Sequence, residues 1–354
     1  MQDISTSNID AFERMIAEAC KISIVTHQKP DGDAMGSCIA LYHFLRTYGK
    51  DSVRILLNDR YPGYLAFLTA DIRREDIVFF QEMPAEGGTI LQDSDLIFCL
   101  DFNAFHRTDR MEPALTSSKG RKILIDHHLN PDREAFDLCF SETDISSASE
   151  LLFHLLMNTS RIARDATMLP AQSATALMTG MTTDTNNFAN STYPSTFMMA
   201  SSLLAAGVDR DSILTHLYNE YRENRLRIMG HMMKDLLTLT EDGVAYIVLD
   251  KKTQEAYGVS EGDTEGFVNM PLSIGKVRMS LLLKEDGDRV RVSIRSKKGT
   301  SANRCARLHF NGGGHENAAG GRLNMPQDIA CIAEAAAYIE RHTHDFFTKD
   351  EKNA

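Results

Sequence analysis

Residues 122–128 read Lys-Ile-Leu-Ile-Asp-His-His, a short apolar run that ends in one carboxylate and two imidazoles. Two other apolar runs end in the same way, 22–25 at the segment 26–33 (Thr-His-Gln-Lys-Pro-Asp-Gly-Asp) and 96–100 at Asp101. Runs of this length predict β-strands. Because the C-terminal ends of parallel strands meet at one edge of a sheet, these polar residues are expected to converge there.

The first 190 residues alternate between strand-like and helix-like segments. Ser146 and Ser147 are expected N-caps for one of the helices, with Glu150 completing a capping box. The alternation predicts an α/β fold with a doubly wound, mostly parallel sheet. The expected strands are 22–26, 52–57, 95–100, 122–125 and 136–140. The expected helices are 34–48, the helix that follows the Ser146 or Ser147 cap and runs through Leu156, and 170–181.

The second half of the chain has a different pattern. Residues 196–240 are helical in character and rich in Leu and Met, which predicts a connector. Strand patterns at 244–249, 276–284 and 289–297 and an amphipathic helix at 329–342 predict a smaller mixed α/β domain. The expected parts are a first domain at 1–190, a helical connector at 191–240 and a second domain at 241–354.

The composition limits the partners of the protein. The net charge of −11 over 354 residues argues against long nucleic acid as a stable partner, but it leaves room for a small phosphorylated substrate. No apolar run approaches the roughly 20 residues that span a bilayer, so no membrane partner is expected. The six cysteines have no CxxC spacing, and no export signal is visible. We therefore expect a cytoplasmic protein with reduced thiols.

The polar residues at the strand ends form a candidate metal site. Such a set, rich in oxygen, with imidazole and no thiolate, suits Mn²⁺, with Mg²⁺, Co²⁺ or Fe²⁺ less favoured. Two ions about 3.5–4 Å apart would share a bridging carboxylate and an activated water. The candidate ligands are His27, Asp31, Asp33, Asp101, His127 and Asp184.

Positions within this set suggest separate roles. Asp101 stands alone at the end of its strand and is the candidate bridge. Asp31 and Asp33 flank Gly32, so they are expected to serve different ions, and Gly32 and Gly36 are expected to permit a tight turn. The alternative is that each Asp only caps a helix or forms a turn.

A basic segment stands out in this acidic chain. Residues 289–315 hold seven Lys or Arg and no acid, and they end in Gly312-Gly313-Gly314-His315. Strand alternation would place Arg291, Ser293 and Arg295 on one face, where they and the glycine loop could bind a phosphate. The alternative is a solvated edge strand made basic to discourage aggregation.

These motifs resemble a known family. The segment His27 to Asp33, Asp101, Asp126-His127-His128 and the segment Gly180 to Thr185 resemble the four motifs of the DHH phosphoesterase superfamily. Ser293-x-Arg295-Ser296 and Gly312 to Gly320 resemble its DHHA1 substrate domain. The combination looks most like the bacterial oligoribonuclease (nano-RNase) and 3′-phosphoadenosine-5′-phosphate phosphatase group. The family often has a glycine where Asn311 stands.

The resemblance implies an Mn²⁺-dependent hydrolase of phosphoric esters with two ions in each active site. It places His27, Asp31 and Asp101 at one ion. It places Asp33, Asp101, His127 and Asp184 at the other. Asp126 would lie behind the ligands, and His128 would contact the scissile phosphate or assist the leaving group. The residues expected to hold the substrate are Ser293, Arg295, Gly312, Gly313, Gly314 and His315.

The sequence leaves three substrate classes open. Short RNA and phosphoadenosine phosphate fit the resemblance, and so does cleavage of cyclic di-AMP or of the linear dinucleotide pApA. A catalytically silent nucleotide-binding sensor is expected to lack metal ligands, whereas all six positions are filled here. The sequence leaves a homodimer open.

Overall fold

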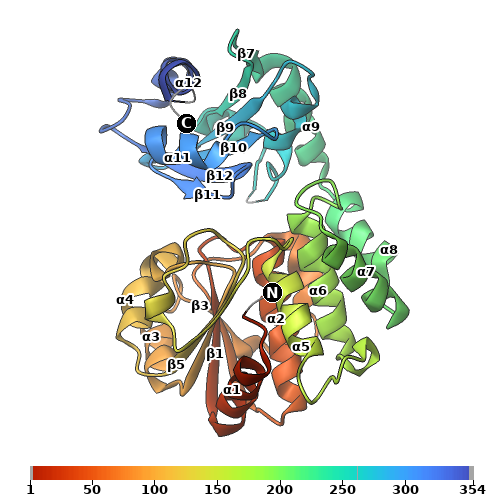
Figure 1. Cartoon of the computed structure of the whole chain (residues 1–354). Coiled ribbons are helices and arrows are strands. Elements are labelled where there is room, and N and C mark those ends of the chain that lie inside the picture. Colours follow the sequence, from red (N-terminus) through yellow and green to blue (C-terminus); the bar gives the residue numbers. More distant parts are fainter. Residues whose placement is uncertain (1–2, 261, 351–354) are drawn as a thin grey trace. The chain divides into compact units, whose positions relative to one another are not determined.

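The computed structural model describes residues 3–260 and 262–350 (Figure 1). The chain forms two compact units, residues 1–220 and 221–354. The expected connector is helical and is divided between them, with α7 (Pro194–Ala205) and α8 (Arg210–Leu214) in the first unit and α9 (Glu223–His231) in the second. Among the helices of the described residues, none is long and apolar enough to cross a membrane.

The first unit is built on a six-stranded sheet in the order β3-β2-β1-β4-β5-β6, in which all pairs are parallel. The predicted doubly wound α/β fold is therefore confirmed. Most predicted strand limits hold within one or two residues, whereas β3 was not predicted. The strands are β1 (Lys21–Thr26), β2 (Ser52–Leu57), β3 (Ile77–Phe79), β4 (Leu96–Leu100), β5 (Arg121–Asp126) and β6 (Leu138–Ser141).

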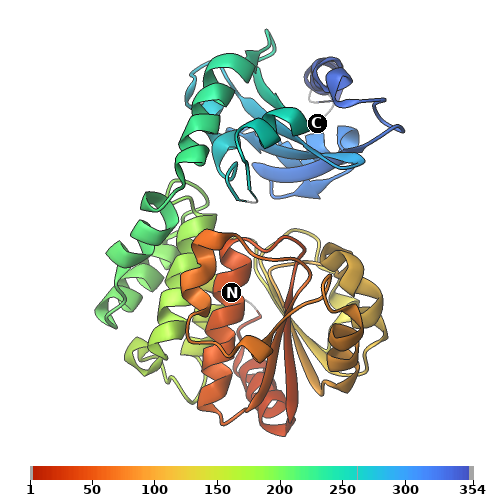
Figure 2. The ribbon, with the colours of Figure 1, turned by 180° about the vertical axis from the view of Figure 1, so that it is seen from behind.

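Helices cover both faces of this sheet (Figures 1 and 2). The larger apolar core lies on one face. In it the Phe12 ring packs edge to face against Phe98 and Phe140, with ring centroids 5.8 and 5.9 Å apart. A second apolar cluster fills the other face. The first face carries α1 (Thr6–Glu18), α2 (Gly32–Thr47), α5 (Ala148–Met157) and α6 (Ala171–Asp184), and the second carries α3 (Pro84–Asp93) and α4 (Glu112–Ser117).

The strand order creates a natural binding edge. From β1 the chain winds outward to β2 and β3, and it then returns to β4 on the other side of β1 and winds outward again. In open parallel sheets, ligands bind beyond the carboxyl ends of the strands at such a switch point. His27 follows β1 and Asp101 follows β4, so both stand at this point.

The second unit contains a mixed sheet in the order β11-β12-β10-β9-β8-β7, with only β8 and β9 parallel. Helices α11 and α12 cover one face over a separate apolar core. The elements are β7 (Thr238–Leu239), β8 (Val244–Leu249), α10 (Lys251–Ala256), β9 (Met279–Asp286), β10 (Arg289–Ser296), α11 (Ala302–His309), β11 (Gly313–Gly314), β12 (Ala318–Asn324) and α12 (Ala335–Asp345).

In the second unit one alternative is excluded and one expectation is wrong. The basic strand β10 lies between β9 and β12, so the alternative of a basic edge strand does not hold. The C-terminal helix begins at Ala335 and not at Ile329, because a 3₁₀ turn at Ile332–Glu334 precedes it. The sequence pattern also missed α11 and β12.

Glu150 ties α5 to α7 in the first unit. Its buried carboxylate accepts hydrogen bonds from Ser146 N at 3.1 Å, from Ser146 Oγ and from Thr196 Oγ1 at 2.7 Å. The Ser147 hydroxyl accepts from Glu150 N at 2.9 Å, so the predicted serine N-cap is present. The Glu150 carboxylate accepts from Ser146 N, one residue before the cap, so the reciprocal bond of the predicted capping box is not formed. Burial raises the pKa of Glu150, but His154 and the hydroxyl donors outweigh it and lower the pKa to about 2.

We predict that Glu150→Gln lowers the free energy of unfolding at neutral pH by about 2 kcal/mol, because charge-assisted hydrogen bonds are lost. Because the pKa of Glu150 is lower in the folded state than in the unfolded state, its carboxylate stabilises the fold at pH values above the unfolded-state pKa. This stabilisation is lost as the pH falls through the folded-state pKa. The difference from wild type should therefore shrink between the usual glutamate range and about pH 2. Urea unfolding across this range tests it, with exposed Glu134→Gln as control. A difference that stays constant down to pH 2 contradicts the assignment.

Candidate metal centre

Asp101 lies at the centre of the polar cluster. It follows β4 with a left-handed φ of 62°, and it is 3% exposed. Its Oδ2 lies 3.4 Å from His27 Nε2, and its Oδ1 lies 3.5 Å from His127 Nε2. Within the described residues, Oδ1 is buried and accepts no hydrogen bond. The two oxygens of one carboxylate therefore face two different groups of potential ligands.

The first group contains His27, Asp31 and Asp101. His27 Nδ1 donates to the carbonyl of Gln28 at 2.8 Å, which leaves Nε2 directed at the carboxylates. Asp31 Oδ1 lies 3.8 Å from that nitrogen and also accepts from Asp33 N and Ala34 N at 3.1 Å, as the N-cap of α2. Capping thus fixes the Asp31 carboxylate beside His27.

The second group surrounds His127 at the end of β5. Its Nε2 lies 3.8 Å from Asp33 Oδ2 and 3.6 Å from Asp184 Oδ2, in addition to its approach to Asp101. Asp184 is the last residue of α6. Asp31 and Asp33 therefore belong to different groups, and both groups include Asp101.

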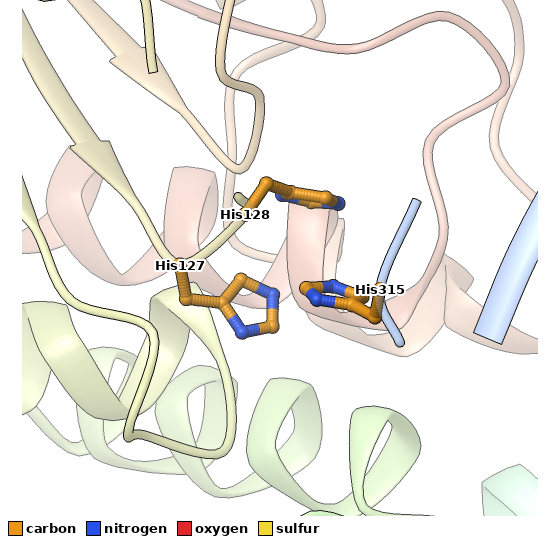
Figure 3. Close-up of side chains that lie close together, drawn as sticks. All are labelled: His127, His128 and His315. Carbon is orange, nitrogen blue, oxygen red and sulfur yellow. The ribbon is translucent and has the colours of Figure 1, made fainter. Parts of the chain in front are cut away.

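His128 has a separate environment. Its Nδ1 donates to Asp126 Oδ1 at 2.7 Å and lies 3.7 Å from Asp101 Oδ1. Asp126 is fully buried. Figure 3 shows that the two imidazoles at the end of β5 point in different directions, and their planes meet at 71°. The buried carboxylate thus orients His128 toward the cluster.

The start of α5 holds Asp33, which the sequence pattern did not reveal. Ala148 N donates to Asp33 Oδ2 at 2.7 Å, and Ser149 N donates to Oδ1 at 2.9 Å. Helix N-terminal N–H groups and the helix dipole both favour a carboxylate. The predicted serine N-cap located the start of α5. Nothing in the sequence pattern linked this helix terminus to Asp33, which lies 115 positions before Ala148.

Close packing of α2 on α6 brings Asp33 and Asp184 to one place. A Cβ on Gly36 would lie 2.6 Å from Ala176 O and 2.9 Å from Gly180 Cα, and a Cβ on Gly32 would meet Thr183. Both glycines lie within α2, so the expectation that they permit a tight turn is wrong. Gly36 is small because the backbone of α6 lies against it, and Gly32 is small because the Thr183 side chain of α6 lies against it.

The charges of the cluster shift its pKa values. Burial lowers the pKa of His27, but Asp101 and Asp31 outweigh it and raise the value to about 10. Burial also lowers the pKa of His127, but the neighbouring Asp101 and Asp184 outweigh it and raise the value to about 10. Burial, together with the charges of Asp101 and Asp184, raises the pKa of Asp33 well above its usual range.

The pKa values of Asp184 and Asp101 shift in opposite directions. Burial raises the pKa of Asp184 to about 6, because the charges of Asp101 and Asp31 reinforce it against His127. For Asp101, burial is outweighed by His127 and His27, and the pKa falls well below the usual range. The imidazoles and the carboxylates of the cluster therefore shift one another's pKa values, because their charges interact at close range.

These residues fit divalent cations. The two groups offer only carboxylate oxygens and imidazole nitrogens. The candidate ligand atoms of His27, Asp31 and Asp101 lie within 4.8 Å of one another, and so do those of Asp33, Asp101 and His127. Asp184 adds a carboxylate oxygen 3.6 Å from His127 Nε2. The buried Oδ1 of Asp101 has the free acceptor capacity that a cation would use. Oxygen-rich sites with imidazole suit Mn²⁺ and Mg²⁺ better than structural zinc.

In the second unit, the expected substrate residues lie on or beside the mixed sheet. Arg291, Ser293 and Arg295 alternate with buried Val292 and Ile294 on β10, as predicted from the strand pattern. His315 N donates to Ala318 O at 2.8 Å in the turn before β12.

The glycine segment is not the open loop that we expected. Gly313 and Gly314 pair with β12 as the short strand β11. A Cβ on Gly312 would lie 1.9 Å from Gly320 O, so packing requires the glycine there. Asn311 adopts a left-handed φ of 48°, a conformation that asparagine tolerates, so it does not disturb the backbone that a glycine would take.

Comparisons with known proteins agree with this fold and site. The DHH family N-terminal domain matches residues 21–181, and the DHHA1 domain matches residues 240–340. A bifunctional oligoribonuclease and PAP phosphatase of *Thermus thermophilus* is 29% identical, and the match covers 88% of each chain. A cyclic-di-AMP phosphodiesterase of *Geobacillus thermodenitrificans* is 25% identical over 95% of this chain and 49% of its own length.

Similarity to solved structures extends over nearly the whole chain. An exopolyphosphatase-related protein from *Bacteroides fragilis* is 36% identical, with 97% of each chain covered and a TM-score of 0.86. The fold and the site define a hydrolase of phosphoric esters. The chain belongs to the DHH family and carries a DHHA1 domain.

We predict that Gly36→Ala loosens the contact between α2 and α6. Overpacking a close contact costs about 1–3 kcal/mol, and it would also weaken divalent-cation binding because Asp33 and Asp184 lie on these two helices. Thermal unfolding and calorimetric titration with Mn²⁺ measure both effects. Gly88→Ala is the matched control, since Gly88 lies within α3 with no atom near its Cβ position. Equal behaviour of the two variants would contradict this role of Gly36.

Proposed function

We propose that the protein is an Mn²⁺-dependent phosphoesterase that degrades short oligoribonucleotides exonucleolytically to mononucleotides, hydrolyses 3′-phosphoadenosine-5′-phosphate, or does both. The observation that carries the proposal is the sharing of Asp101 between the two ligand groups. The *T. thermophilus* relative, named for both activities, supports the substrate class.

The ligand groups suggest one ion each. His27, Asp31 and Asp101 would hold one cation, and Asp33, Asp101, His127 and Asp184 would hold the other. A pair of divalent cations supplies charge neutralisation at a phosphoryl group and lowers the pKa of a bound water. Asp101, with one oxygen toward each group, would bridge them.

The remaining residues would orient the substrate and move protons. Asp126 fixes the His128 ring through the 2.7 Å hydrogen bond, so that His128 can donate a proton to the leaving oxygen or contact the scissile phosphate. Arg295 presents a guanidinium suited to bidentate phosphate binding. Ser293 and His315 would add further donors. The segment from Gly312 to Gly314 would let the substrate approach closely, although Gly312 N already donates to Ala306 O at 3.2 Å.

A second candidate substrate is cyclic di-AMP or its linear product pApA. The relative from *G. thermodenitrificans*, named as a cyclic-di-AMP phosphodiesterase, supports it. A panel of di- to pentanucleotides, longer RNA, phosphoadenosine phosphate, pApA and cyclic di-AMP with Mn²⁺ separates the two. The proposal requires faster turnover of short RNA or phosphoadenosine phosphate. Faster turnover of cyclic di-AMP favours the second candidate, and binding of nucleotides without any turnover favours a silent sensor.

We predict that Asp101→Asn abolishes hydrolysis, with kcat reduced at least about a thousandfold, because loss of a charged oxygen removes the shared ligand. Asparagine tolerates the left-handed φ, so the variant should fold. Initial rates with saturating Mn²⁺ measure the effect, with exposed Asp132→Asn as control. Near wild-type turnover by Asp101→Asn would rule out the shared-ligand proposal.

Arg295→Ala should act differently. We predict a KM raised about tenfold or more with kcat within a few-fold of wild type, since a phosphate contact away from the reacting bond contributes mostly to binding. The KM of Arg295→Lys should lie between the values for wild type and Arg295→Ala, because lysine keeps the positive charge but loses the bidentate geometry. Steady-state kinetics on a dinucleotide test this. A loss confined to kcat would show that Arg295 acts in the chemical step instead.

Metal removal provides an independent test. Dialysis against EDTA should abolish activity, and Mn²⁺ should restore more of it than Mg²⁺ at equal concentration, because imidazole ligands favour the softer ion. Activity that survives chelation would contradict a metal-dependent reaction.

A further inference from the structure

A carboxylate on the neighbouring strand holds the loop between two candidate ligands. Asp59 follows β2, which pairs with β1, and its Oδ2 accepts a hydrogen bond from Lys29 N at 2.8 Å. Lys29 lies between His27 and Asp31 of the first ligand group. The N-cap of the 3₁₀ turn that follows Asp59 is Pro62, so Asp59 does not cap that turn. Its bond to the ligand loop therefore needs another explanation.

One peptide unit connects Asp59 to His27. The N–H of Lys29 and the carbonyl of Gln28 belong to the same planar peptide bond. The N–H donates to Asp59, and the carbonyl accepts from His27 Nδ1 at 2.8 Å. His27 Nε2 then faces Asp101 Oδ2 at 3.4 Å. The contacts therefore run from the Asp59 carboxylate through a peptide and an imidazole to the candidate cation site.

The orientation of this peptide is strained. Lys29 has a left-handed φ of 53°, which is uncommon for a residue with a Cβ. Turning the peptide over would bring this φ into the ordinary negative region, but it would also point the Gln28 carbonyl away from His27. The bond from Lys29 N to Asp59 opposes such a rotation, and the bond from Gln28 N to Arg107 O at 2.8 Å holds the preceding peptide. Asp59 thus keeps the peptide in the orientation that His27 needs.

Asp59 is itself held in place by two side-chain amides. Its Oδ1 accepts from Gln81 Nε2 at 2.7 Å, and its Oδ2 also accepts from Asn58 Nδ2 at 2.9 Å. Asn58 is fully buried, and its carbonyl accepts from Gln81 N at 3.1 Å, which ties the ends of β2 and β3 together. Because both oxygens of Asp59 accept hydrogen bonds, the carboxylate has little freedom to rotate away from Lys29.

We propose that Asp59 is a positioning residue for the metal centre, which orients His27 through the Gln28–Lys29 peptide. Metal-binding histidines commonly donate their second ring N–H to a carboxylate or a backbone carbonyl, which fixes the ring and makes it a stronger ligand. Here a carbonyl and a carboxylate act in series, and hydrogen bonds in a chain polarise one another. The inference rests on the proposed function in one respect only, that His27 binds a divalent cation.

Calorimetric titration of the metal-depleted protein with Mn²⁺ measures the effect. Asp59→Ala should weaken the binding of one ion about tenfold or more, as the loss of such a partner usually does. Asp59→Asn should lie between wild type and Asp59→Ala, because an amide oxygen still accepts from Lys29 N while the charge is lost. Unchanged Mn²⁺ affinity in Asp59→Ala would overturn the proposal.

Glu82→Gln is the matched control for the loss of one negative charge. Glu82 follows β3 at the same edge of the sheet, and its carboxylate accepts from Arg60 Nε at 2.6 Å and not from the ligand loop. This variant should keep the wild-type Mn²⁺ affinity. A loss equal to that of Asp59→Asn would show that only the overall charge matters, and it would overturn the role of the peptide.

A spectroscopic measurement separates this inference from the proposed function. In metal-depleted protein with isotope-labelled histidine, the NMR signal of the His27 Nδ1 proton is assigned from its loss in His27→Gln. The signal should move upfield in both Asp59 variants as the bond to Gln28 weakens, whereas Glu82→Gln should leave it in place. If wild type binds no Mn²⁺, the proposed function fails, while this signal still decides whether Asp59 acts on His27. An unmoved signal in Asp59→Ala would refute the link between them.

Discussion

The candidate metal centre depends on one buried carboxylate whose two oxygens face different groups of ligands. Asp101 has its Oδ2 toward His27 and its Oδ1 toward His127, and it reaches this position through a left-handed backbone conformation at the end of β4. A residue with a Cβ is uncommon in that conformation, and strain of this kind is concentrated at functional sites. The arrangement places a single negative group between imidazoles that follow β1 and β5.

The surroundings hold the other carboxylates in place. The N-cap of α2 fixes Asp31, the first N–H groups of α5 fix Asp33, and the close contact between α2 and α6 sets the position of Asp184. Each device is a backbone feature and therefore rigid. Side chains that approach one another closely only after the whole first unit has folded need such support, because their mutual repulsion would otherwise separate them.

Much of the first unit could be predicted from the sequence. The apolar runs that end in His27, Asp101 and His127 gave both the strands and the edge where the residues meet, because parallel strands converge there. The Gly32 and Gly36 positions were misread as turn glycines, since a sequence pattern does not show that another helix lies against them. The contact of the α5 terminus with Asp33 was invisible for the same reason: it joins segments distant in the chain.

The second unit was less predictable. Strand alternation on β10 identified the polar face, but β12 escaped notice because its glycines and alanines lack the β-branched residues that mark strands. Without β12, an edge position for β10 stayed open as the alternative, and the alignment of Arg291 with Arg322 could not be seen. The DHH and DHHA1 matches establish the family, whereas the boundary between the parts and the roles of individual residues remain predictions.

If one carboxylate joins two cation sites, the metal-depleted protein should bind two Mn²⁺ ions. Isothermal titration with Mn²⁺ measures this, because it reports the number of ions per chain. We expect two ions for wild type and loss of at least one for Asp101→Asn. A single ion in wild type, or two ions retained at unchanged affinity in Asp101→Asn, would show that Asp101 is not a shared ligand.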